Sequence, residues 1–531
     1  MSDEKQLEYW KAQLVRKRIG RREFIGRAAA LGLTTALATT LATKVAGAAP
    51  NKGGSLRMAI GAGATTDSLD PGSTTDNYMG LLGMNTGSTL TQILPDGSVA
   101  GDLAASYEPA DDGKTWVYKL VKGATFHNGK DITADDVVAT IHHHQGEDSK
   151  SAAKSILEQI TEVKADGKHT VVFTLANGSA DFPFVTNDYH LPILPTVDGK
   201  ADWASGVRSG PYKLDNLEPG VSIKMSRYEN YYNDNEAFFA DIEILSIPDV
   251  TARTNALTTG EVQYMDRADL KTLDLLKQNP NVEIAEVTGY GHYVLPMNVT
   301  VAPFDNVHVR QALKYAVNRQ DIVDKVFLGH ATPGNDNPIA PTIQYATNPE
   351  PIYSYDPDKV KFHLGKAGLT SLKVDLSAAD AAFAGAVDAA VLYQEHAAKA
   401  GIEINVIREP NDSYWDAVWM KKPWCMSYWN GRPTCDWMFT TAYAADAAWN
   451  DTFWKNDRFN ELLKAARAET DTAKRAAMYA EMQQILHDDG GILVMVFNNY
   501  VTGNTKTLAH DKIGASLEVD SMRLPRRWWF A

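Results

Sequence analysis

Cysteine is scarce in this chain: only two of its 531 residues are cysteines, Cys425 and Cys435. A structural metal site needs more ligands at closer spacing than this pair supplies, so a cysteine-based metal centre is not supported. The two residues lie ten positions apart, and two states remain open for them. In an oxidising compartment they can form a disulfide that clamps the intervening loop, or both can be buried as free thiols.

The motifs of common enzymes are also missing. There is no G-x-S-x-G, H-E-x-x-H or C-x-x-C, and the glycine-containing stretches 61–66 and 123–131 lack the pattern of a nucleotide-binding loop. The three successive histidines at 142–144 point about 100° apart on a helix, so they cannot chelate one ion from one face. We interpret them as a solvated face. We therefore expect no enzyme, no catalytic residue, no metal ligand and no cofactor.

Positive charge is in short supply outside the amino terminus. The chain has a formal charge of −14. Residues 1–48 hold nine Lys or Arg and four Asp or Glu, so they carry +5 and the remainder carries −19. A body this acidic repels phosphate backbones and anionic membrane surfaces. We therefore expect no nucleic-acid partner.

The amino terminus lacks a long hydrophobic run. Residues 28–43 are apolar but rich in threonine, and they are fewer than the about 20 apolar residues of a membrane span. They follow a basic stretch with the pair Arg21 and Arg22, and they precede A-G-A at 46–48, a small-residue cleavage site. No cysteine follows this site, which excludes a lipid anchor. We interpret 1–48 as a twin-arginine-like export signal and expect the remainder to be free in the periplasm.

The length of the chain exceeds one ordinary hydrophobic core, so at least two domains are expected. Residues 54–60, 116–120 and 170–175 alternate like strands, and Thr133 begins an amphipathic helix. Helical patterns dominate later, first after a predicted cap at Asp305 and then over 459–486, before 492–497 returns to a strand. This order predicts two lobes between which the chain crosses twice.

The segment 422–454 is the candidate binding site. It holds five of the twelve tryptophans and both cysteines, together with Arg432 and Asp436. Aromatic walls with one cation and one anion suit a dry pocket for a small, partly apolar, charged ligand. Trp429 is our first choice for such a wall, with Tyr428 and Trp437 beside it, although these rings can equally belong to the core.

Several longer motifs follow one another in order along the chain. They are G-D-L-A at 101–104, D-D-G-K-T-W at 111–116, F-H-N-G-K at 126–130, T-A-D-D-V at 133–137, S-G-P-Y-K at 209–213, R-Y-E-N-Y-Y at 227–232, P-F-D-N-V at 303–307, V-R-Q-A-L at 309–313 and A-V-N-R at 316–319. This series resembles the bacterial extracellular solute-binding proteins of the peptide/nickel type, which serve ABC importers. The similarity covers nearly all of the exported part.

The resemblance implies an α/β, two-lobed periplasmic binding protein fold with an extra subdomain in lobe one and a two-strand hinge. On this basis we expect lobe one at 49–292, lobe two at 293–497 and a return to lobe one at 498–531. The hinge strands should lie near 290–299 and 492–500. A small solute or short peptide would be enclosed between the lobes. The closed form, expected to be a monomer, would dock on an ABC transporter permease in the inner membrane.

The resemblance also singles out Arg432. Peptide-binding relatives carry an aspartate shortly after their tryptophan, where it holds the amino terminus of the peptide. Alignment on Trp429 and Gly431 puts Arg432 at that place. A guanidinium there repels an ammonium and suits a carboxylate or phosphate in a fork geometry. Asp436 would contact a ligand cation or orient the arginine; alternatively, Arg432 and Asp436 pair and brace the loop.

Thr65 and Thr66, which follow the first strand, complete the predicted set of ligand contacts. The function that we favour is capture of a peptide, a peptide-like molecule or another anionic small solute for an ABC importer. One alternative is a metal or metal-chelate receptor of the same fold, which would need histidines that converge on the cleft. The other is an exported hydrolase, which would need a nucleophile and a base that the sequence does not offer.

Overall fold

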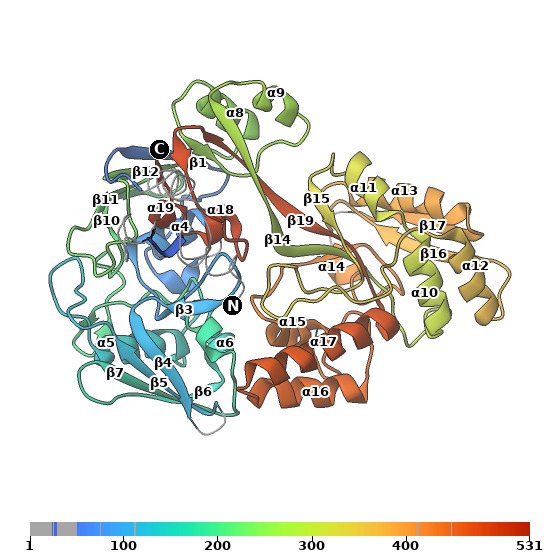
Figure 1. The fold of residues 1–531 in the computed structure, drawn as a ribbon, viewed down its shortest axis with the longest axis horizontal. Helices are drawn as coiled ribbons and strands as arrows, with labels where there is room; N and C mark the ends of the chain where they lie inside the picture. The colour runs from blue at the N-terminus through green and yellow to red at the C-terminus, as the bar shows by residue number, and fades with distance from the viewer. Residues whose placement is uncertain are drawn as a thin grey trace.

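The computed structural model of the chain describes residues 24, 26–28, 50–74, 76–110, 113–410, 414–447 and 449–531. Two lobes lie side by side and are joined by a pair of long strands (Figure 1). This mixed α/β, two-lobed architecture confirms the predicted fold class. Nearly all of the predicted export signal lies outside the described residues. Within the described part of the chain, no helix has both the length and the apolar character needed to cross a membrane.

The largest sheet runs from lobe one into lobe two. Its strands follow the order β10-β11-β12-β1-β13-β19-β14-β18, and β15 pairs with β19 beside this path. Strand β1 pairs in parallel with β12 and β13, whereas the other pairs are antiparallel. The bounds are β10 Tyr212–Glu218, β11 Ser222–Arg227, β12 Asp241–Ser246, β1 Ser55–Ile60, β13 Tyr264–Met265, β19 Ile492–Thr505, β14 Val282–Pro296, β18 Ser427–Trp429 and β15 Ala331–Pro333.

The hinge consists of β14 and β19, which have 15 and 14 residues. They pair antiparallel from Val282 opposite Thr505 to Pro296 opposite Ile492. One end of the pair lies beside β13 in lobe one, and the other lies beside β15 and β18 in lobe two. The two predicted crossing strands are therefore present, and β14 begins eight residues before the predicted position 290.

An extra subdomain of lobe one is built on a four-stranded antiparallel sheet in the order β4-β5-β7-β6. Helix α5 packs on this sheet and begins with the predicted cap: Thr133 and Asp136 form a reciprocal capping box. His144 on this helix is buried against Ser151, so the predicted solvated face is wrong at that position. The bounds are β4 Ala104–Ala110, β5 Thr115–Leu120, β7 Thr170–Leu175, β6 Ile160–Ala165 and α5 Ala134–Gln145.

Lobe two is rich in helices. Its parallel strands β16 and β17 pack with one group of helices, while a second group lies nearer the extra subdomain of lobe one (Figure 1). Helix α10 is capped by Asn306, one residue after the predicted Asp305. The bounds are β16 Leu372–Ala378, β17 Ile402–Arg408, α10 Val307–Ala316, α11 Arg319–Lys325, α12 Pro357–Lys366, α13 Ala386–Ala398, α14 Tyr414–Ala417, α15 Cys435–Ala442, α16 Asp457–Ala468 and α17 Thr472–Asp489.

The carboxyl-terminal tail lies on lobe one. Arg523 and Arg526 both reach the buried carboxylate of Asp102, at 3.2 and 2.9 Å. The remaining elements are η1 Pro71–Ser73, α4 Asn77–Thr86, β2 Thr91–Ile93, β3 Val99–Gly101, α6 Lys154–Leu157, α7 Phe182–Val185, β8 Thr196–Val197, β9 Lys200–Ala201, α8 Val250–Thr258, α9 Leu273–Lys277, β20 Leu508–Ala509, α18 Glu518–Ser521, α19 Leu524–Arg527 and β21 Trp529–Phe530.

Candidate functional site

Trp429 lies on the edge strand β18, opposite His292 of the hinge strand β14. It is only 5% exposed and belongs to a group of three tryptophans. Its ring centroid is 6.3 Å from that of Trp419 and 6.2 Å from that of Trp449. Trp449 is 52% exposed. Trp429 is therefore part of a hydrophobic core of lobe two, whereas Trp449 is open to solvent. The aromatic wall stays a prediction.

A buried carboxylate holds two of these rings. Asp451 Oδ2 accepts hydrogen bonds from Trp429 Nε1 at 3.2 Å and from Trp419 Nε1 at 3.1 Å. Burial raises the pKa of Asp451 to about 7, although the two indole N–H groups favour the charged form and act in the opposite direction. Asp451 could not be selected from the sequence, because no local sequence pattern distinguishes it from the other aspartates of the segment 422–454.

Arg432 lies in the loop between β18 and α15. Its Nη1 donates a 2.6 Å hydrogen bond to the backbone oxygen of Asn430. Burial lowers the pKa of Arg432, and the phenol of Tyr189, which belongs to lobe one, acts in the opposite direction. The side chain of Arg432 is half-buried, and its interaction with Tyr189 indicates that the guanidinium is on the side of lobe two that faces lobe one. Among the described residues, no carboxylate lies within ion-pair distance of it.

Buried arginines of the chain differ in their partners. Arg319 is 2.8 Å from Asp336, whereas Arg208 donates to three backbone oxygens. A charge removed from water without a partner is costly, because it loses hydration and gains no compensating contact. Arg432, which is half-buried, has a backbone oxygen as its partner and no carboxylate among the described residues.

Asp436 does not pair with Arg432. It lies in the first turn of α15, where its oxygens are 3.2 and 3.3 Å from Nε of Arg467 on α16. Burial raises the pKa of Asp436 to about 6; Arg467 opposes this shift, and the negative charge of Asp181 adds to it. The alternative in which Arg432 and Asp436 brace each other is therefore wrong, and the carboxylate serves helix packing instead.

The other residues that were predicted to contact the ligand lie in separate parts of the fold. Tyr428 is 39% exposed and alternates with Trp429 along β18, so it points to the opposite face of the sheet. Trp437 is half-buried in the first turn of α15. Thr65 and Thr66 lie on an exposed turn against the β10–β11 hairpin. Because β10–β11 and β18 are at opposite ends of the sheet order, the structure does not bring these threonines to Trp429.

The two cysteines are both buried and free. Cys425 belongs to the core around β16 and β17, whereas Cys435 begins α15 and contacts the backbone oxygen of Gln344 at 3.4 Å. Burial raises the pKa of each thiol. Of the two states considered, the structure has the free thiols, and the disulfide is absent because the side chains pack in separate cores.

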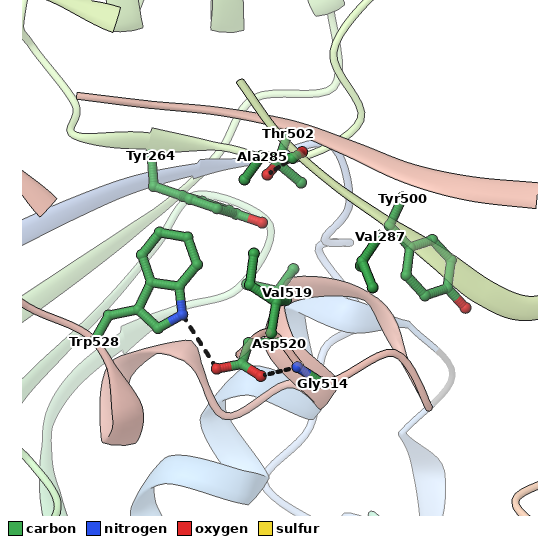
Figure 2. Close-up of a pocket in the computed structure, with 10 residues that line it drawn as sticks. Tyr264, Ala285, Val287, Tyr500, Thr502, Gly514, Val519, Asp520 and Trp528 are labelled. Carbon is green, nitrogen blue, oxygen red and sulfur yellow. Dashed lines mark hydrogen bonds between the residues drawn. The ribbon is translucent and has the colours of Figure 1, made fainter. Parts of the chain in front are cut away.

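A small cavity of about 10 Å³, with room for about one water molecule, lies beside the hinge strands on the lobe-one side (Figure 2). Asp520 is its buried acid, and it accepts hydrogen bonds from Gly514 N at 2.6 Å and from Trp528 Nε1 at 3.1 Å. Both oxygens of the Asp520 carboxylate therefore already accept hydrogen bonds from the protein. The lining residues are Tyr264, Ala285, Val287, Tyr500, Thr502, Ile513, Gly514, Val519, Asp520 and Trp528.

Two lobes that are joined by a strand hinge have the architecture of a periplasmic solute-binding protein. The sequence pattern of the bacterial extracellular solute-binding proteins, family 5 (middle region), matches residues 98–451. The chain belongs to this family. It is a substrate-binding protein of the kind that serves ABC transporters, and not an enzyme.

The similarity to known proteins extends over most of the chain. The glutathione-binding protein GsiB of Escherichia coli O6:K15:H31 (strain 536 / UPEC) is 26% identical over 503 residues, which cover 90% of this chain and 94% of GsiB. HbpA2 from Haemophilus parasuis matches in structure with a TM-score of 0.80 at 19% identity, over 90% of this chain and 100% of HbpA2. DppA from Helicobacter pylori, solved with the peptide STSA, matches with a TM-score of 0.68 at 23% identity, over 90% and 98%. These two structures show the shared fold.

Proposed function

We propose that this protein captures a peptide or peptide-like solute that carries a carboxylate or another anionic group, and delivers it to a membrane permease. The observation that carries the proposal is the half-buried guanidinium of Arg432, which has no carboxylate partner among the described residues. The ligand would supply the missing negative charge. The tryptophan group around Trp429 would cover its apolar part.

Physical chemistry supports an anionic ligand over a cationic one. A carboxylate or phosphate can accept two parallel hydrogen bonds from the planar guanidinium, and closure of the lobes removes water that would otherwise screen the pair. An ammonium at the same place would be repelled. The name of the relative GsiB agrees with this class of ligand, because glutathione is a small peptide with two carboxylates.

From the sequence, we also propose that the chain is exported through a twin-arginine-like signal at 1–48, that it is located in the periplasm and that it acts as a monomer. The division into lobes at 49–292, 293–497 and 498–531 is proposed on the same basis. A metal chelate as the ligand is the alternative within the same fold, and the experiment below includes it.

The experiment is a thermal-shift screen followed by calorimetry. A ligand that binds only the folded state stabilises it by RT ln(1 + [L]/Kd), so the size of the shift ranks the members of a panel by affinity. The panel contains short peptides, glutathione, opines, sugars and nickel chelates. Each peptide is also tested with its carboxylates converted to amides.

We expect the carboxylates to bind and Arg432→Ala to weaken the best ligand by roughly 10- to 100-fold, the loss of a charge-assisted contact. Arg432→Lys should recover part of the affinity. Arg458→Ala is the matched control, because this exposed arginine pairs with Glu481 on the surface of lobe two. Equal binding of the amidated peptides, or unchanged affinity in Arg432→Ala, would rule out the anionic-ligand assignment.

A further inference from the structure

Two histidines meet on the outer face of lobe two, on helices that are not part of the site described above. His308 is in the first turn of α10, and His363 is in the last turn of α12. Both side chains are half-buried, and their rings lie 5.5 Å apart. These helices are at the end of lobe two that faces away from lobe one (Figure 1).

The nitrogens that face each other have the separation of two ligands of one metal ion. His308 Nδ1 is 3.3 Å from His363 Nδ1, and it is 3.2 Å from Oε1 of Gln311. Two nitrogens that each lie about 2.0–2.1 Å from a zinc ion at the tetrahedral angle are about 3.3–3.4 Å apart. The separation of the two nitrogens therefore matches that of a tetrahedral pair.

Two of the three side chains are held in place by a second contact. The ring of His363 stacks on Tyr315 with an interplanar angle of 19°. The backbone of His308, but not its ring, is held by a 2.9 Å hydrogen bond from its N–H to Asn306 Oδ1. The amide nitrogen of Gln311 donates to the backbone oxygen of Asp488 at 3.3 Å, which turns Oε1 toward His308. Such outer contacts orient metal ligands and fix the tautomer of a ligating imidazole.

Hydrogen bonds alone do not satisfy all three of the facing atoms, His308 Nδ1, His363 Nδ1 and Gln311 Oε1. A proton on His308 Nδ1 can be donated well to His363 Nδ1 or to Gln311 Oε1, but not to both. A cation accepts lone pairs from all three atoms at once. Burial and the neighbouring charges of His308 and Lys359 lower the pKa of His363. The ammonium of Lys359 lies over the ring of Tyr315, at 4.8 Å from its centroid.

We propose that His308 and His363, with the amide oxygen of Gln311, form a binding site for a divalent transition-metal ion of the kind that imidazole nitrogens bind, such as Zn²⁺. Within the described residues, no group of three or more His, Cys, Asp or Glu side chains is placed to hold a metal. The site therefore uses two imidazoles and one amide oxygen, and water completes the tetrahedron. It lies on the body of lobe two and is independent of the solute held between the lobes.

The test is calorimetric titration of the full chain, expressed without a polyhistidine tag, with zinc chloride. We expect one Zn²⁺ ion per chain. His363→Ala and His308→Ala should each weaken binding by at least the roughly 10- to 100-fold that outer-contact changes cost at metal sites. Gln311→Ala should have a smaller effect. His142→Ala is the matched control, because it removes an exposed histidine of α5 in lobe one and should leave the affinity unchanged.

Cobalt provides a second readout that does not depend on affinity. Co²⁺ bound in a four-coordinate site absorbs visible light far more strongly than six-coordinate aqueous Co²⁺, and this absorption should appear with the wild type and disappear with His363→Ala. Equal zinc affinity in the wild type and His363→Ala would overturn the proposal. So would a lack of saturable binding by the wild type, or a loss of binding in His142→Ala alone. Thermal unfolding of each variant confirms that it is folded.

Discussion

Asp451 is the residue on which the aromatic wall depends. Its carboxylate connects the indoles of Trp419 and Trp429, which are ten positions apart in sequence and meet only in the folded chain. The side chain is buried, and this burial keeps its proton bound well above the pH at which an exposed aspartate loses it. Neutral pH therefore lies close to its titration.

The first prediction concerns the pH dependence of stability. The folded-state pKa of Asp451 is about 7, whereas its ordinary value is 3.8, so the folded state retains a proton that the unfolded state releases. The contribution of this group is greatest below pH 3.8 and is lost as the pH rises toward 7. Asp451→Asn imitates the protonated form. Its free energy of unfolding relative to wild type should rise by up to about 4 kcal/mol between pH 4 and 8.

Urea unfolding of both proteins at several pH values measures this difference, because the other titrating groups cancel. Asp446→Asn is the control, since Asp446 is exposed in the same segment and should show no such trend. A constant difference between Asp451→Asn and wild type across this range would show that the carboxyl is ionised throughout.

At the scale of elements, the short edge strand β18 determines where Arg432 lies. The loop after β18 turns at Gly431, where a Cβ atom would be 2.2 Å from Cβ and from the backbone oxygen of Tyr290. Tyr290 lies on β14 in a stretch where the register with β19 is irregular. The loop that carries the cation is thus pressed against the hinge itself, and only glycine allows this approach.

The second prediction follows from this contact. Gly431→Ala should displace the loop, lower the free energy of unfolding by on the order of 1–3 kcal/mol and weaken ligand binding. Gly365→Ala is the matched control, because Gly365 lies within α12 and a Cβ there meets no atom within 4 Å. That change should instead stabilise the protein by about 0.4–1 kcal/mol. Chemical unfolding and calorimetry measure both, and equal behaviour of the two variants would contradict the role of the contact.

At the scale of the whole molecule, the two lobes are in contact at a second place besides the hinge. Arg475 on α17 of lobe two is 2.6 Å from Asp181, which precedes α7 in lobe one. Beside it, the backbone N–H of Ala180 donates to the oxygen of Arg467 at 2.8 Å. Both charged side chains are buried. This ion pair forms only when the lobes are together.

The third prediction is that Asp181→Ala opens the molecule. Removal of one partner leaves Arg475 buried without its counter-ion, which costs about 3–5 kcal/mol in comparable buried pairs. An open arrangement relieves this cost because it hydrates the guanidinium. The radius of gyration from small-angle X-ray scattering should increase, and ligand affinity should fall. Arg458→Ala, within lobe two, should change neither, and an unchanged radius in Asp181→Ala would show that the pair does not hold the lobes together.

Some features of this protein could be predicted from local patterns. The strands at 116–120 and 170–175, the cap at Thr133 and the return to a strand at 492 are present, because period and capping depend on neighbours in sequence. The roles of Trp429 and Arg432 in ligand binding rest on the composition of the segment 422–454 and on the family resemblance, and they stay predictions. The motif series indicated the family, and residues 98–451 confirm it.

Only the tertiary structure decided the partners of the charged groups. Asp436 pairs with Arg467 and not with Arg432, which is nearer in sequence. Asp451 accepts hydrogen bonds from two indoles, and the two cysteines pack in separate cores. Each of these outcomes depends on which helices and lobes meet. Sequence distance carries no information on that, because burial and charge pairing are determined by contacts across the fold. The sequence by itself determined the family and most of the elements, and the meeting of helices and lobes decided which charged groups pair.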